Sequence, residues 1–66
     1  MEIIVNGESK MIEPGTSVEV YIRLLDLDPE AVVVEYDTKI IKREDYKTCI
    51  LADGGKLELI RFVGGG

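Results

Sequence analysis

The residue types of this chain exclude several kinds of covalent chemistry. The chain has 66 residues and no histidine, so a Ser-His or Cys-His catalytic pair is excluded. Its single cysteine, Cys49, permits neither an internal disulfide nor a CxxC metal site, and we expect it to be a small buried hydrophobe. The sequence ends in Gly64-Gly65-Gly66, and a bare triple glycine is by itself weak evidence of function.

A glycine tail suits chemistry that takes place inside another protein. Three extended residues reach roughly 10 Å, and glycine has no Cβ that could clash with a narrow channel. We therefore expect residues 64–66 to form a flexible tail beyond a domain of residues 1–63. The alternative is a frayed terminus or a linker without function.

The composition limits the classes of partner. Thirteen acidic residues against eight basic ones give a net charge of −5, which argues against nucleic acid because phosphate contacts need clustered Lys and Arg. An acidic surface suits solubility and also docking on a basic protein. Residues 1–5 lack a basic region of the signal-peptide type, and no stretch approaches the ~20 apolar residues of a membrane span, so we expect a cytoplasmic protein.

The first half of the chain predicts a hairpin followed by a helix. Residues 1–5, apolar apart from Glu2, lead into Asn6-Gly7, the strongest short hairpin signal, and residues 9–12 form the returning strand. Thr16 and Glu19 match a capping box at the start of a helix of about ten residues, which ends before Asp28-Pro29. The predicted buried stripe of this helix is Val18, Tyr21, Ile22 and Leu25.

The second half predicts strands. Residues 31–36 form a β-branched strand, and a short strand surrounds Ile40-Ile41. The polar connection 43–49 turns Tyr46 inward, and residues 56–63 form the last strand. The predicted fold is α+β: one domain with a mixed sheet of four to five strands and one main helix on one face.

Apolar residues on the face without the helix predict an interaction surface. Ile60 and Phe62 alternate with Leu57 and Leu59 along the last strand, so they point away from the helix. If the first strand is a neighbour, Ile4 joins them in an exposed patch of the kind that marks protein interfaces. A second small core beneath residues 43–49 is an equally good interpretation of Ile60 and Phe62.

The whole pattern resembles the ubiquitin-like β-grasp sulfur carriers, and above all the ThiS family of thiamine biosynthesis. The motifs are Asn6-Gly7, Pro14-Gly15-Thr16, Val32-Val33-Val34-Glu35, Ile40-Ile41-Lys42-Arg43-Glu44, Asp53-Gly54 and Phe62-Val63-Gly64-Gly65-Gly66. Some positions depart from the usual family pattern: Asp37-Thr38 stands for Asn-Gly, Lys42 for proline, Tyr46 for tryptophan and Gly54-Gly55 for Gly-Asp.

The resemblance implies a protein co-substrate and not an enzyme. An E1-like adenylyltransferase uses ATP to adenylate the carboxylate of Gly66, and a sulfur donor protein then converts it to a thiocarboxylate. Thiazole synthase takes the sulfur. The carrier itself binds no cofactor or metal and is monomeric alone. The expected partner contacts are Ile4, Ile60, Phe62, Val63, Gly64 and Gly65.

Three alternatives remain open. The recipient of the sulfur could be molybdopterin synthase or tungsten-cofactor synthesis. The chain could be a ubiquitin-like modifier that forms isopeptide bonds with lysines. It could also be a β-grasp interaction module without chemistry at Gly66, in which case deletion of Gly65-Gly66 leaves its activity unchanged.

Overall fold

The chain begins with a β-hairpin, as its sequence predicts. In a computed structural model, which describes residues 1–61, β1 (Glu2–Val5) and β2 (Glu8–Met11) pair antiparallel. The turn between them holds Asn6 at a φ of 49° and Gly7 at 84°. Asn and Gly are the residues that adopt these positive φ values most readily, so the prediction of an Asn-Gly turn is confirmed.

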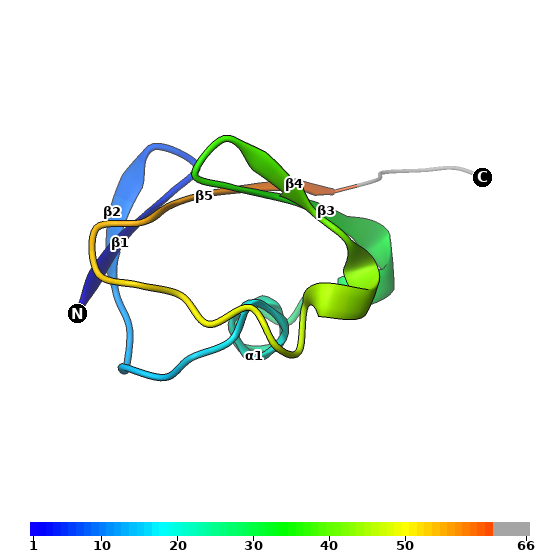
Figure 1. Cartoon of the computed structure of the whole chain (residues 1–66), viewed down its shortest axis with the longest axis horizontal. Coiled ribbons are helices and arrows are strands. Elements are labelled where there is room, and N and C mark those ends of the chain that lie inside the picture. The colour runs from blue at the N-terminus through cyan, green and yellow to red at the C-terminus, as the bar shows by residue number, and fades with distance from the viewer. Residues whose placement is uncertain (62–66) are drawn as a thin grey trace.

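The last strand lies in the middle of the sheet. The strand order is β2-β1-β5-β3-β4, with β3 at Val32–Tyr36, β4 at Lys39–Ile41 and β5 at Lys56–Arg61. β5 runs parallel to β1 and antiparallel to β3 (Figure 1). Within residues 1–61 the sheet is therefore mixed and five-stranded, with one α-helix against it, which confirms the predicted ubiquitin-like β-grasp fold.

The helix α1 spans Val18–Leu24 and is shorter than predicted, at seven residues. Its cap is Ser17, whose Oγ accepts a hydrogen bond from the Val20 N–H at 3.1 Å. The predicted capping box at Thr16 is wrong, because the Thr16 hydroxyl donates to the Glu13 carbonyl at 2.6 Å. The helix also ends earlier than Asp28, and Leu25 is 42% exposed, so it does not belong to the buried stripe.

Figure 1 shows α1 against one face of the sheet, and the buried apolar side chains of these elements form the core. Its fully buried side chains are Ile3, Val18, Ile22, Val32, Val34 and Leu57. The predicted inward position of Tyr46 is confirmed, since this residue is 2% exposed. In the described chain, α1 and the connection that includes Tyr46 thus cover the apolar face of the sheet.

Two short 3₁₀ turns precede β3 and follow β4. The turn η1 (Pro29–Ala31) precedes β3, which begins at Val32 and one residue later than predicted. The turn η2 (Arg43–Asp45) follows β4. Among residues 1–61, no helix has the length and the apolar character needed to cross a membrane.

Candidate functional site

The two ends of β5 have different neighbours. β1 pairs with β5 only at its start, where Ile4 lies beside Lys56 and Val5 beside Leu57. The turn residue Asn6 then closes this ladder, because its Oδ1 accepts from the Leu59 N–H at 2.8 Å. From there to Arg61, the last residue described, β5 pairs with β3 through Val33–Ile60 and Val32–Arg61. The end of β5 lies on the far side of the sheet from the N-terminus (Figure 1).

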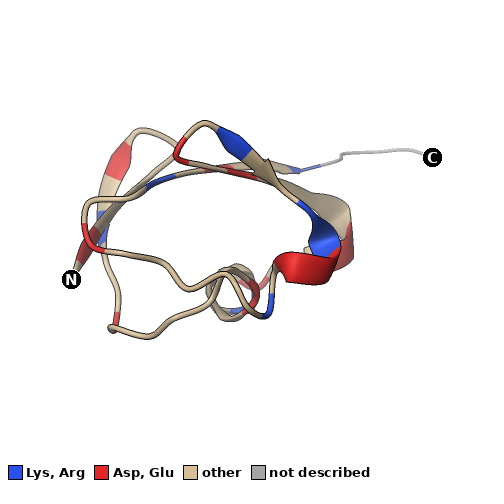
Figure 2. Cartoon of the chain, viewed as in Figure 1, with Lys and Arg blue, Asp and Glu red and all other residues tan. Residues whose placement is uncertain are grey.

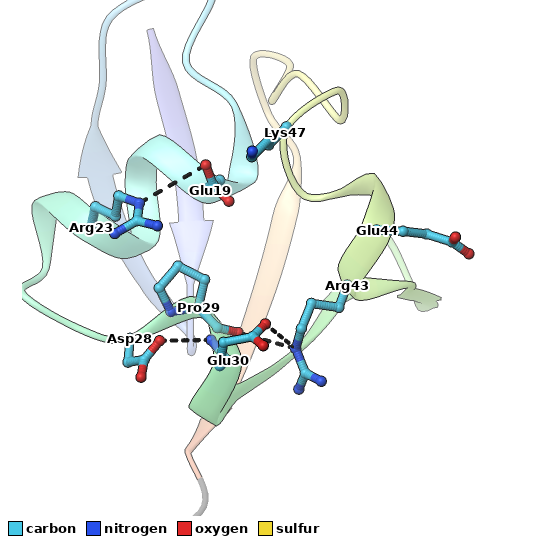
Figure 3. Close-up of a pocket in the computed structure, with 8 residues that line it drawn as sticks. All are labelled: Glu19, Arg23, Asp28, Pro29, Glu30, Arg43, Glu44 and Lys47. Atoms are coloured by element: carbon cyan, nitrogen blue, oxygen red, sulfur yellow. Dashed lines mark hydrogen bonds and ion pairs between the residues drawn. The ribbon is translucent and has the colours of Figure 1, made fainter.

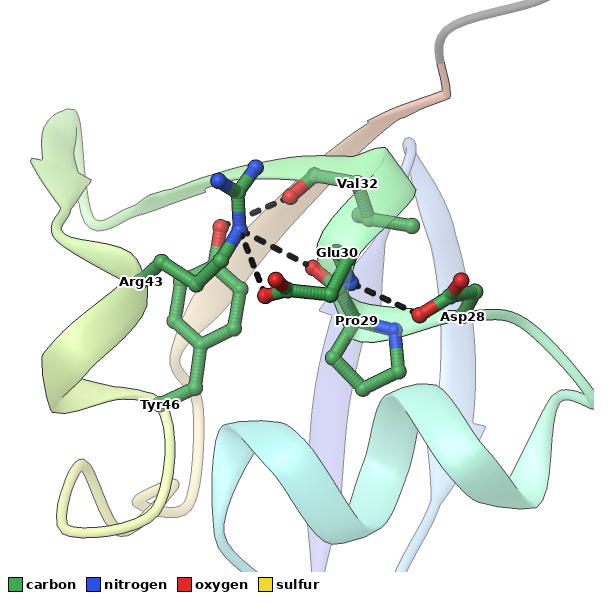
Figure 4. Close-up of polar contacts among 6 residues, drawn as sticks. All are labelled: Asp28, Pro29, Glu30, Val32, Arg43 and Tyr46. Carbon is green, nitrogen blue, oxygen red and sulfur yellow. Dashed lines mark hydrogen bonds and ion pairs between the residues drawn. The ribbon is translucent and has the colours of Figure 1, made fainter.

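A set of polar contacts supports the strand beside Arg61. Figure 4 shows the Tyr46 hydroxyl donating to the Val32 carbonyl, at 2.7 Å. The Arg43 Nε lies 3.4 Å from both the Pro29 carbonyl and a Glu30 carboxylate oxygen. These contacts join η1 and η2 at the start of β3. Arg61, the last described residue of β5, is therefore paired with a strand whose first residue is held by these contacts. We call the contacts of Tyr46 and Arg43 the brace.

A groove lies between α1, η1 and η2, on the helix side of this brace. Figure 3 shows its lining residues: Glu19, Arg23, Asp28, Pro29, Glu30, Arg43, Glu44 and Lys47. Several of the charges pair with one another, with Arg23 3.9 Å from Glu19 and Arg43 3.4 Å from Glu30. Basic and acidic residues alternate here, and in Figure 2 the described chain forms no continuous basic stripe. We interpret the groove as a solvated surface.

The described residues hold no metal centre. Within residues 1–61, no three His, Cys, Asp or Glu side chains lie close enough together to bind a metal ion. The Cys49 thiol is half-buried beside the core, which partly confirms the prediction of a buried hydrophobe. Burial raises the pKa of this thiol, and the Asp45 carboxylate raises it further. A protonated thiol is a weak nucleophile, so Cys49 is a poor candidate for covalent chemistry.

The face of the sheet opposite α1 carries a distinct surface near the end of β5. Leu57 and Leu59 are buried, so Glu58 and Ile60 point to the other face. The register places Val33 opposite Ile60, Glu35 opposite Glu58 and Ile40 opposite Glu35. We call these five residues the open-face patch: Val33, Glu35, Ile40, Glu58 and Ile60. Ile60 is 51% and Ile40 63% exposed, so Ile60 does not belong to a second core.

The predicted patch of Ile4 with Ile60 is not continuous. Ile4 lies beside Lys56, four residues before Ile60, which corresponds to about 13 Å along the strand. Val33 and Ile40 were not among the predicted contacts. For Val33 the reason is that the apolar run 32–34 does not reveal which of its members faces the helix. The other predicted site residues lie outside the described part of the chain: Phe62, Val63, Gly64, Gly65 and Gly66.

Comparisons with known proteins point to one family. A family model described as the ThiS family matches residues 3–66. A crystal structure of the thiamine biosynthesis protein ThiS from Geobacter metallireducens is 28% identical, with a TM-score of 0.85 and full coverage of both chains. An NMR solution structure of a thiamine biosynthesis protein from the same organism is also 28% identical, with a TM-score of 0.82 over all of this chain and 88% of that one.

Two curated relatives bear the name thiazole synthase. The protein from Paramagnetospirillum magneticum is 33% identical over 66 residues, and that from Magnetococcus marinus is 35% identical over the same length. In both cases all of this chain is aligned, but it spans only 20% of the relative's length. Each of these longer proteins thus contains a segment similar to this entire chain.

Proposed function

The chain belongs to the ThiS family, and from that premise we propose that it is a cytoplasmic sulfur carrier which works through the carboxylate of Gly66. The observation that carries the proposal is that the family match runs through Gly64-Gly65-Gly66, the part of the sequence suited to this chemistry. The chain itself is a co-substrate and not a catalyst. Its partners supply the catalysis, and ATP is consumed by the activating partner.

The proposed chemistry proceeds in two steps at Gly66. A carboxylate is a poor electrophile, so an E1-like adenylyltransferase first joins it to the AMP part of ATP, with release of pyrophosphate. Sulfide delivered by a donor protein then attacks the acyl carbon and AMP leaves, so that the new carbon–sulfur bond replaces the bond to AMP and a thiocarboxylate remains. We propose that thiazole synthase takes this sulfur for thiazole formation in thiamine biosynthesis.

The described structure is compatible with such a division of labour. β5 is held on both sides at its start and extends past β1 at its end, with Arg61 paired to Val32. The described part of β5 therefore ends beside β3, five residues before Gly66 in the sequence. The thiazole synthase relatives support the choice of recipient, since each contains a segment similar to this chain.

A reconstituted thiazole-forming reaction tests the proposal. The full chain and a variant lacking Gly65 and Gly66 are each combined with the E1-like enzyme, the sulfur donor and thiazole synthase. We expect thiazole product with the full chain and none with the shortened one. Equal product from both chains contradicts the proposed role of Gly66 and favours an interaction module.

The same preparation separates the recipient pathways. The charged chain is offered in parallel to thiazole synthase and to the large subunit of molybdopterin synthase. Sulfur transfer to thiazole synthase alone supports the proposed pathway. Transfer to the molybdopterin system alone keeps the carrier chemistry but replaces the recipient.

A further inference from the structure

Two glutamates face each other on the open side of the sheet. Glu35 on β3 lies directly opposite Glu58 on β5, and both point away from α1. Within residues 1–61 neither carboxylate takes part in an ion pair. Like charges directly opposite in a sheet are destabilising, and the net charge of −5 adds to the repulsion. The isolated domain gains nothing from this pair.

Apolar side chains lie beside the two carboxylates, on β4 and at the next pair of β3 and β5 on the same face. Ile40 lies next to Glu35 on β4, and the Val33–Ile60 pair lies one step further along. Ile40 and Ile60 keep more than half of their surface in water. Apolar side chains beside a charged pair help to exclude water once a partner covers them, which strengthens an ion pair formed there.

We propose that the open-face patch docks thiazole synthase by receiving one of its arginines between Glu35 and Glu58. This inference rests on the proposed function and adds the surface and the residue type that the partner must supply. A guanidinium has five donors in a planar fork and can bind both carboxylates at once, which the compact ammonium of lysine does less well. Apolar partner side chains cover Ile40, Val33 and Ile60 around it.

The position of the patch fits this partner. Glu58 and Ile60 belong to the part of β5 that leads directly to the proposed reactive end of the chain. A partner that covers them lies beside Arg61, the last described residue, which is five residues before Gly66 in the sequence. The chain's negative charge favours encounter with a basic surface.

The proposal predicts opposite effects on stability and on binding. Glu58→Gln and Glu35→Gln keep the shape of the side chain and remove the repulsion, so each raises Tm by about 1–5 °C. The same variants lose the charge that holds the arginine, and the Kd for thiazole synthase rises about 10- to 100-fold. A merely structural role of the pair predicts the Tm change alone.

The experiment measures binding of purified thiazole synthase from the same organism by titration calorimetry, with thermal unfolding of each free variant. Glu44→Gln on η2 is the control, since it removes one negative charge outside the patch, and its Kd stays within about twofold of the unmodified chain. Unchanged Kd values for both patch variants overturn the docking proposal while leaving the carrier chemistry intact. Failure of the unmodified chain to bind overturns the choice of thiazole synthase as well.

A second measurement identifies the arginine. Exposed arginines of thiazole synthase are replaced by alanine one at a time, and each variant is titrated with the unmodified chain and with Glu58→Gln. One arginine is expected to show an interaction energy with Glu58 in the double-mutant cycle, so that the two losses of affinity do not add. Additive losses at every arginine overturn the proposed contact.

Discussion

The two ends of β5 differ in how the fold holds them. At the start, the Ile4 N–H donates to the Gly55 carbonyl at 2.9 Å, and the Lys56 N–H donates to Asp37 Oδ1 at 2.8 Å. The end has β3 as its neighbour and exposes Ile60 on the open face. One strand thus stabilises the domain at one end and presents a surface at the other. Substitutions at the start should therefore reduce stability, whereas those at the end should reduce binding.

The largest expected effect is a loss of stability from a substitution at the start of β5. Leu57 is fully buried, so Leu57→Ala creates a cavity and lowers the free energy of unfolding by about 2–5 kcal/mol. Ile60→Ala, three residues further along, changes it by no more than about 0.5 kcal/mol because Ile60 is half exposed. Chemical denaturation followed by circular dichroism measures both. Equal losses in the two variants would contradict the contrast between the ends.

The next effect concerns the brace behind the end of β5. Tyr46→Phe removes the hydroxyl that donates to the Val32 carbonyl and leaves a buried acceptor unsatisfied, at a cost of about 1–3 kcal/mol. The matched control is Tyr36→Phe, whose hydroxyl accepts an exposed bond from the Ala52 N–H. The control should lose less than about 1 kcal/mol. A larger loss in the control than in Tyr46→Phe would show that the brace is unimportant.

A smaller effect of opposite sign is expected in the turn between β3 and β4. Thr38 has a φ of 73°, a left-handed conformation that is strained for a β-branched residue. Thr38→Gly should therefore raise the free energy of unfolding by about 0.5–1 kcal/mol. Asp37→Gly should bring no such gain, because it also removes the acceptor for the Lys56 N–H at the start of β5. Destabilisation by Thr38→Gly would contradict this interpretation.

The smallest effect concerns the thiol, which we do not assign to the chemistry. Because burial raises the pKa of Cys49, its thiolate forms at higher pH than that of an unfolded chain, whose value is about 8.5. Stability gained from the neutral thiol is full below the unfolded pKa and is lost as the pH rises through the folded one. The rate of iodoacetamide labelling against pH measures this shift, with urea-unfolded protein as the reference. A labelling midpoint at or below that of the unfolded protein would refute it.

Local signals in the sequence predicted most of the elements. Asn6-Gly7 specified the first hairpin, because few other residue pairs accept its φ values. The helix start was harder, since Thr16 and Ser17 are both good capping residues. The Thr16 hydroxyl is bonded to Glu13 in the preceding turn, and Ser17 is therefore the residue that caps the helix. Local patterns could not decide between two adjacent candidates of the same chemical type.

The sequence did not reveal the register in which β5 pairs with its neighbouring strands. The alternation along β5 correctly placed Ile60 on the open face. Which residues lie beside it depends on pairing with strands about 25 and 50 positions earlier, and a shift of two residues satisfies the same alternation. The structure pairs Ile60 with Val33 and places Ile4 beside Lys56. The Glu35–Glu58 pair therefore became visible only in the folded chain.

Sulfur carriage by the carboxylate of Gly66 is the proposal on which the others depend. Intact-protein mass spectrometry after co-expression with the E1-like enzyme and its sulfur source is its sharpest test, with fragmentation to locate any change. We expect a mass gain equal to the exchange of one oxygen for sulfur, located at Gly66, in the unmodified chain and in Cys49→Ala. An unchanged mass with a partner set known to be active, or a sulfur that is lost in a folded Cys49→Ala protein, would contradict it.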